Sequence, residues 1–128
     1  MVFRAFAIPA ALLIFSVATY AAPPARAAAT VEDERSEAKA QVEFGIRAAQ
    51  NELWKEATYR WEKATQIDPT YAEAWNNLAI GYEYTGRFEQ AEAAYQRALK
   101  LDPDNTLIRQ NYDLFTELNV RTKSRRDR

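Results

Sequence analysis

The feature that most constrains how this 128-residue chain can fold is an internal repeat. Two segments end alike, EKATQIDP at 62–69 and QRALKLDP at 96–103, so that Pro69 and Pro103 stand at equivalent positions. Five further pairs of residues with the same separation have side chains of similar size and polarity: Ala57 and Ala91, Trp61 and Tyr95, Ala64 and Ala98, Ile67 and Leu101, and Asp68 and Asp102. The period predicts stacked copies of one small supersecondary unit.

Within one period, the apolar residues are spaced as on one face of an α-helix. Two such stripes occur: Trp75, Leu78 and Tyr82, then Ala91, Tyr95 and Ala98. The small residues Ala79 and Gly81 would let a neighbouring helix approach closely. Small side chains opposite large rings can also fill space efficiently, because the small residue leaves the gap that the ring occupies. The pattern therefore predicts packed pairs of helices.

Residues that end and begin helices agree with this period. Gly86 can adopt the left-handed conformation that ends a helix, and Pro103 disfavours helix at the residue before it. Thr70 with Glu73 has the layout of a capping box, and Asp104 or Asn105 can cap the next helix. We therefore expect five helices, at about 33–50, 54–67, 71–84, 88–100 and 105–119.

These residues resemble the tetratricopeptide repeat, whose period of roughly 34 residues equals the separation of Pro69 and Pro103. The second period carries the motif in full at Trp75, Leu78, Tyr82, Gly86, Ala91, Tyr95, Ala98 and Pro103, with Ala79 where the family often has glycine. The first period keeps Phe44, Gly45, Ala57, Trp61, Ala64 and Pro69. It departs from the motif at Gln41, Ala48 and Glu52, the last of which stands where the turn glycine would be.

The resemblance implies an all-α fold, a helical-hairpin solenoid with two helix pairs and a C-terminal capping helix. The repeat domain would cover 38–119, with repeats at about 38–71 and 72–105 and the cap at 106–119. One broad apolar side of the cap would meet the second repeat, and it is formed by Leu107, Ile108, Leu114, Phe115 and Leu118.

The resemblance also implies a concave groove lined by the first helix of each pair, a shape that binds peptides. Matching the family's geometry gives the candidate groove residues Val42, Ile46, Gln50, Asn76, Asn77, Ile80 and Glu83. A clamp for a terminal carboxylate is not expected, because Val42 and Ile46 stand where basic or amide groups would be needed. The composition of the list favours an amphipathic peptide or helix. The alternative is that Val42 and Ile46 are core residues that pack against the last helix or a second subunit.

Residues 1–29 have the layout of a secretory signal peptide. Arg4 precedes an uncharged apolar run at 5–20, and small residues follow up to Ala29. We expect export, cleavage near Ala29 and a bacterial periplasmic location. A retained membrane anchor is the alternative, although the run is short for a span of roughly 20 residues.

The charge is uneven along the remaining chain. Residues 30–120 carry 10 basic and 17 acidic groups, whereas residues 121–128 carry five basic groups and one acidic group. We expect 30–37 to be a short acidic lead-in and 120–128 to be a basic, disordered tail. The tail has no interleaved aromatic residues, so nucleic acid is not an expected partner.

The residue inventory argues against catalysis. The chain has no histidine and no cysteine, which excludes metal sites and nucleophiles built from those residues. No glycine-rich phosphate loop occurs, so we expect no metal, no cofactor and no enzyme activity. Two functional hypotheses remain: an adaptor that docks a peptide of an envelope assembly, and a structural subunit that associates with itself. A membrane-anchored scaffold is a third.

Overall fold

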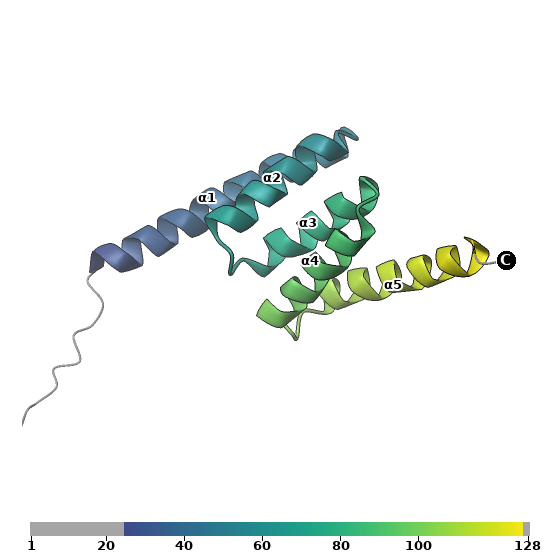
Figure 1. Cartoon of the computed structure of the whole chain (residues 1–128). Helices are drawn as coiled ribbons and strands as arrows, with labels where there is room; N and C mark the ends of the chain where they lie inside the picture. The colour runs from purple at the N-terminus through teal and green to yellow at the C-terminus, as the bar shows by residue number, and fades with distance from the viewer. Residues whose placement is uncertain (1–24, 127–128) are drawn as a thin grey trace, which may run out of the picture.

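The computed structural model describes residues 25–126, and within them it contains five α-helices and no strand. These are α1 (Ala25–Gln50), α2 (Trp54–Ile67), α3 (Ala72–Tyr84), α4 (Phe88–Leu101) and α5 (Thr106–Arg126). Helices α1 and α2 lie side by side, as do α3 and α4, and α5 follows against α4 (Figure 1). The all-α solenoid of helical hairpins is therefore confirmed.

The bounds of α2, α3 and α4 agree with the prediction to within one residue, but the two outer helices are longer. Residues 30–37, expected as a lead-in, belong to α1, and residues 120–126 belong to α5 rather than to a separate tail. Alanine, arginine, lysine and glutamate are good helix formers, and they dominate both extensions. Of the expected signal segment at 1–29, residues 1–24 lie outside the described residues, and residues 25–29 belong to α1. Within the described part of the chain, no helix is long and apolar enough to cross a membrane.

The core forms two clusters that follow the two helix pairs. The first surrounds Trp61 and contains Ala38, Val42, Ala57, Ala64, Ala74 and Leu78. The second surrounds Tyr95 and contains Ala79, Ala91, Ala94 and Phe115. Ala91 and Ala98 are fully buried beside the nearly inaccessible Tyr95. The predicted packing of small residues against rings is thus confirmed.

Two glycines allow side chains of α2 to lie directly against the backbones of α1 and α3. A Cβ atom at Gly45 would lie 2.3 Å from Nε1 of Trp61, and one at Gly81 would lie 2.6 Å from Oγ1 of Thr58. The indole Nε1 of Trp61 also donates a hydrogen bond to the carbonyl oxygen of Val42, at 3.2 Å. The ring of Trp61 therefore fixes the spacing between α1 and α2.

The helix ends confirm some of the residues that were predicted to begin or end helices. Gly86 has φ +76°, and Glu52, at the equivalent position of the first repeat, has φ +60°. Asn105 caps α5, since its Oδ1 accepts a hydrogen bond from the amide of Ile108 at 3.2 Å.

The capping box predicted at Thr70 and Glu73 is wrong. The Thr70 hydroxyl donates to Asp68 at 2.7 Å and accepts a hydrogen bond from Arg35 at 3.0 Å, and α3 has no side-chain cap. Arg35 also forms an ion pair with Asp68. These contacts join α1 to the turn between α2 and α3, and they occupy the hydroxyl that would have capped the helix.

Candidate functional site

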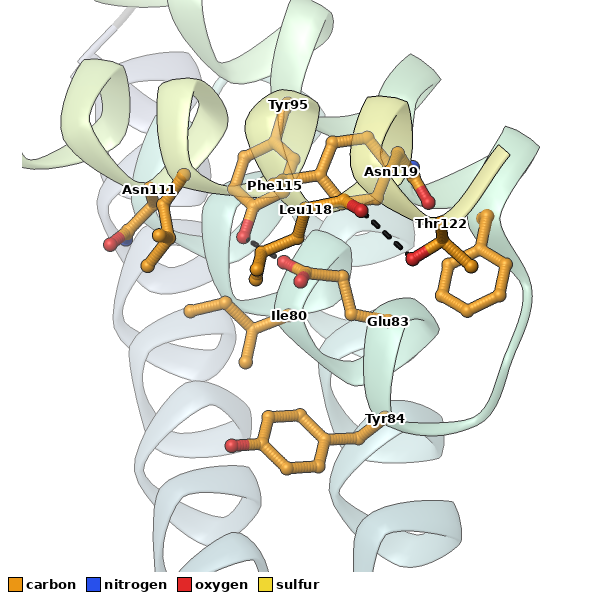
Figure 2. A pocket seen from close by; sticks show the side chains of 11 residues that line it. Ile80, Glu83, Tyr84, Tyr95, Asn111, Phe115, Leu118, Asn119 and Thr122 are labelled. Atoms are coloured by element: carbon orange, nitrogen blue, oxygen red, sulfur yellow. Dashed lines mark hydrogen bonds between the residues drawn. The ribbon is translucent and has the colours of Figure 1, made fainter. Parts of the chain in front are cut away.

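An open groove of about 560 Å³ lies between α3, α4 and α5. Figure 2 shows side chains from these helices meeting across it. The lining residues are Ile80, Glu83, Tyr84, Phe88, Tyr95, Asn111, Leu114, Phe115, Leu118, Asn119 and Thr122. Its volume falls in the range of about 300–1,000 Å³ that is common for binding sites.

The walls of the groove expose large apolar side chains to solvent. Tyr84 is 63% exposed, Leu114 57%, Leu118 51% and Phe88 43%. Clustered apolar exposure of this kind on a folded chain marks an interaction surface, because scattered apolar residues are normal but contiguous ones are not. The groove is therefore the candidate functional site.

Helix α5 provides one wall because it occupies the place of the first helix of a third repeat. Thr106 follows Ala72, the first residue of α3, by one repeat period. Leu114 and Leu118 consequently correspond to Ile80 and Tyr84 on α3. In α5 the apolar residues divide into two sets: Ile108 and Phe115 are buried, whereas Leu107, Leu114 and Leu118 are exposed. The expected single apolar side of the cap is thus only partly buried, since one helix can turn only one stripe toward α4.

Buried aromatic rings support the floor of the groove. The rings of Tyr95 and Phe115 are 5.5 Å apart, a separation at which tilted rings attract each other. The Tyr95 hydroxyl points toward Glu83 and donates a hydrogen bond to its Oε1 at 2.5 Å (Figure 2). The position of the Glu83 carboxylate is thereby fixed by α4.

Glu83 is the acidic group of an otherwise apolar or amide-lined surface. Burial raises its pKa above the ordinary glutamate value, and the hydrogen bond from Tyr95 opposes part of that rise. Burial also raises the pKa of Tyr95, and the neighbouring Glu83 raises it further. None of the described residues that line the groove is basic. The carboxylate therefore lies in a site that disfavours its charge and supplies no cation.

Two of the seven predicted groove residues, Ile80 and Glu83, line this groove. The other five lie elsewhere. Val42 is 2% exposed within the first core cluster, and Ile46 packs against that cluster. Both therefore belong to the core, but the cluster is formed by α1, α2 and α3 rather than by the last helix. Gln50 is exposed at the end of α1, and Asn77 is half-buried.

Asn76 is only 5% exposed, and its Oδ1 accepts a hydrogen bond from Asn111 of α5 at 3.1 Å. This contact explains the difference from the prediction, because Asn111 of α5 lies against Asn76 at this point of α3. The signal that could have found the groove is the repeat spacing from Ile80 to Leu114 and from Tyr84 to Leu118.

A second hollow, of about 790 Å³, lies at the turns of the two helix pairs. It is lined by Leu53, Trp54, Lys55, Glu56 and Glu52 from the first pair, and by Tyr84, Thr85 and Gly86 from the second. The rings of Trp54 and Tyr84 stack with centroids 3.5 Å apart. Tyr84 lines both hollows, so the apolar surface continues from the groove around the end of α3. Among the described residues, no three His, Cys, Asp or Glu side chains gather as a metal would require.

The fold and groove define the class of protein: a short helical-repeat protein with an open apolar groove. Residues 72–105 match the family model described as tetratricopeptide repeat. The tetratricopeptide-repeat domain of Arabidopsis OM64 has a similar structure, with a TM-score of 0.64 at 22% identity, covering 70% of this chain and 74% of that domain. Residues 72–105 therefore form a tetratricopeptide repeat, as the motif predicted, and the chain shares its fold with a tetratricopeptide-repeat domain.

The curated relatives are much longer than this chain. The mouse protein O-mannosyl-transferase TMTC1 is 33% identical over 84 residues, which is 66% of this chain and 9% of that protein. The chloroplastic tetratricopeptide repeat domain-containing protein PYG7 of Arabidopsis thaliana is 27% identical over 85 residues, 66% of this chain and 28% of that protein. Fission-yeast anaphase-promoting complex subunit 3 is 30% identical over 64 residues, half of this chain and 10% of that subunit. The similarity is thus confined to a small part of each relative.

Proposed function

We propose that this chain is a non-catalytic interaction module whose groove docks an amphipathic helical segment of another protein. The observation that carries the proposal is the exposure of Tyr84, Phe88, Leu114 and Leu118 around one open groove. Domains of this family bind other proteins or peptides, and the fold and the family match extend that expectation to this chain.

A helix suits this groove better than an extended strand. Ile80 and Tyr84 lie four residues apart on α3, and Leu114 and Leu118 lie four residues apart on α5. The groove thus presents two helical rows of apolar side chains, and a third helix can pack its own apolar stripe between them. Binding by β-strand addition would need a free sheet edge, and the described residues contain no strand.

The non-catalytic part of the proposal is supported by the sequence. With no histidine or cysteine in the chain, the usual nucleophile and base pairs cannot be assembled. The relatives named as mannosyl-transferases share only about a tenth of their length with this chain, so their printed activity is not carried over to it.

For location, we propose export to a bacterial periplasm, where the groove would dock a component of an envelope assembly. The support is the order of charged, apolar and small residues in 1–29. N-terminal sequencing of the protein from fractionated producing cells tests this. A first residue near Thr30 in the periplasmic fraction supports export with cleavage, and an intact Met1 in the membrane fraction supports the anchored alternative.

The groove can be tested by a pair of leucine substitutions on α5. Leu114→Glu places a charge in the groove, while Leu107→Glu makes the same change at a position that is 61% exposed on the same helix and does not line the groove. Short helical peptides, selected from a display library against the full chain, serve as probes. We expect Leu114→Glu to weaken binding at least tenfold and Leu107→Glu to leave it unchanged.

Equal binding by both variants, with unchanged helical content by circular dichroism, would show that the groove is not the docking site.

A second candidate function is self-association, which is favoured by the exposure of Leu107, Leu114 and Leu118 on the terminal helix. Burial of these side chains in a second copy would be favourable at roughly 25 cal/mol per Å². Sedimentation over a hundredfold range of concentration decides this point, since a constant monomer mass excludes the self-associating subunit.

A further inference from the structure

We infer that the helical segment docked in the groove carries a lysine or arginine that pairs with Glu83. This inference rests on the proposed function, since it names the chemistry of the partner at the same site. Four observations carry it: the position of the carboxylate, its remaining acceptor capacity, the absence of a cation among the described lining residues, and the apolar surface around it.

The position of Glu83 is fixed from both sides. Its backbone lies in α3, and its Oε1 accepts the hydroxyl of the buried Tyr95 on α4, at 2.5 Å. An ionised carboxylate has two oxygens and can accept about four hydrogen bonds. A single tyrosine hydroxyl therefore leaves most of this capacity available to a donor that enters the groove.

The protein supplies no counter-charge to Glu83 within the part of the chain that the structure describes. The ion pairs found there use other acids, namely Glu43, Glu56, Glu62, Asp68 and Glu117. The comparison with Glu117 is direct, because Glu117 follows Glu83 by one repeat period. Glu117 pairs with Arg121 of its own helix at 2.5 Å, whereas the residue four positions after Glu83 is Arg87, which pairs with Glu62.

An apolar helix lying across the groove would remove water from the Glu83 carboxylate. Burial of an unpaired carboxylate is strongly unfavourable, and pairing it with a cation offsets that cost. A partner with a glutamate or aspartate at this point would add like-charge repulsion. The raised pKa of Glu83 shows that the site already disfavours the anion, and a cation from the partner would reverse that tendency.

The rest of the groove defines the remainder of the partner. Ile80, Leu114 and Leu118 would contact an apolar stripe, and Asn111 and Asn119 offer amide groups at the edge. Because residues 30–120 carry an excess of seven acidic groups, the electrostatic potential of this part of the chain also attracts a basic segment. The fitting occupant is thus an amphipathic helix with one basic residue set within its apolar stripe.

The test is a display selection of short helical peptides against the full chain and against its Glu83→Gln variant. Glutamine keeps an oxygen that can accept the Tyr95 hydroxyl, so the variant removes charge with little change of shape. Peptides selected on the wild-type chain should carry lysine or arginine at one position of the apolar stripe. Peptides selected on Glu83→Gln should lose that preference and keep the apolar positions.

A double-mutant cycle then measures the pair itself. Replacing the selected lysine by glutamine in one wild-type-derived peptide should weaken binding to the wild-type chain about tenfold, and should change binding to Glu83→Gln less than threefold. Equal losses on both proteins, or selected peptides without a basic position, would overturn the inference.

The two proposals fail in different ways. Peptides that lack a basic position but are sensitive to Leu114→Glu would leave the docking function intact and refute the Glu83 pair. Peptides that bind equally well to Leu114→Glu would refute docking in the groove, and the pair with it. Failure to select any helical peptide on a folded chain would count against both.

Discussion

The turn between α1 and α2 offers a sharp test of the repeat geometry, because Glu52 holds a conformation that suits glycine. Its φ is +60°, and the equivalent residue of the second repeat, Gly86, has φ +76°. Left-handed backbone is unfavourable for residues with a Cβ, since this atom approaches the following carbonyl oxygen. We therefore predict that Glu52→Gly stabilises the protein.

The size of the gain follows from two opposing terms. Relief of the left-handed strain contributes about 1–2 kcal/mol. Glycine also has more freedom in the unfolded chain, which costs about 0.4–1 kcal/mol. The free energy of unfolding should therefore rise by about 0.5–1 kcal/mol, and a change of this size moves the melting temperature of a domain of this length by about 2–8 °C.

The reverse substitution, Gly86→Ala, isolates the backbone term. A Cβ atom at Gly86 would have no other heavy atom within 4 Å, so no steric contact adds to the effect. We expect a loss of about 0.5–1 kcal/mol by the same balance of strain and chain entropy. Glu52→Ala is the matched control for the first site, because it removes the glutamate side chain but keeps the Cβ and its strain.

Urea titration followed by far-ultraviolet circular dichroism measures all three variants. The expected order of midpoints is Glu52→Gly above wild type, Glu52→Ala close to wild type, and Gly86→Ala below it. Should Glu52→Gly be no more stable than Glu52→Ala, the positive φ would not be the source of strain. The equivalence of the two turns would then lose its physical basis.

Two further predictions concern the first helix pair. Gly45→Ala should destabilise the protein by about 1–3 kcal/mol, because the new Cβ would lie 2.3 Å from Nε1 of Trp61; a midpoint in urea close to that of the wild type would show that α1 and α2 are not this close. Burial raises the pKa of Asp68, but hydrogen bonds from Thr70 and Arg35 outweigh burial and lower it below its ordinary value. The stability that Asp68 contributes is therefore present above about pH 4 and is lost as the pH falls through the lowered pKa. In urea titrations, the wild-type protein should lose more stability than Asp68→Asn between pH 5 and pH 2. Equal losses of stability in the two proteins would contradict this prediction.

The features that the sequence predicted well are those that local spacing determines. Ala91, Tyr95 and Ala98 lie on one helical stripe, and a small residue beside a ring has few ways to pack other than the one observed. The left-handed turn at Gly86 follows from a single residue type. Such features need no knowledge of what lies far away in the chain.

The features that were missed depend on contacts between distant residues. Thr70 has the pattern of a helix cap, but Arg35, which is 35 residues away in sequence, and Asp68 take its hydroxyl. Val42 was placed in the groove by family geometry, yet its side chain is buried and its carbonyl oxygen accepts a hydrogen bond from the indole of Trp61. In both cases a long side chain from another helix decided the outcome.

The register of the repeat explains why the proposed docking groove lies between α3 and α5 and does not extend to α1. The position of Ile80 is Ile46 in α1 and Leu114 in α5, and the position of Tyr84 is Gln50 in α1 and Leu118 in α5. At the position of Tyr84, an apolar side chain is thus present on α3 and α5 but is replaced by a polar glutamine on α1.

The same register separates the residues proposed to contact a partner from the core residues on the last helix. Phe115 is buried against Tyr95, while its sequence neighbour Leu114 is exposed in the groove. A change at Leu114 can therefore alter binding without opening the core, whereas a change at Phe115 cannot. The position of Glu83 is an alanine in α1 and an internally paired glutamate in α5. Glu83 therefore adds a carboxylate that only α3 offers to the proposed partner, while it also accepts the hydroxyl of the core residue Tyr95.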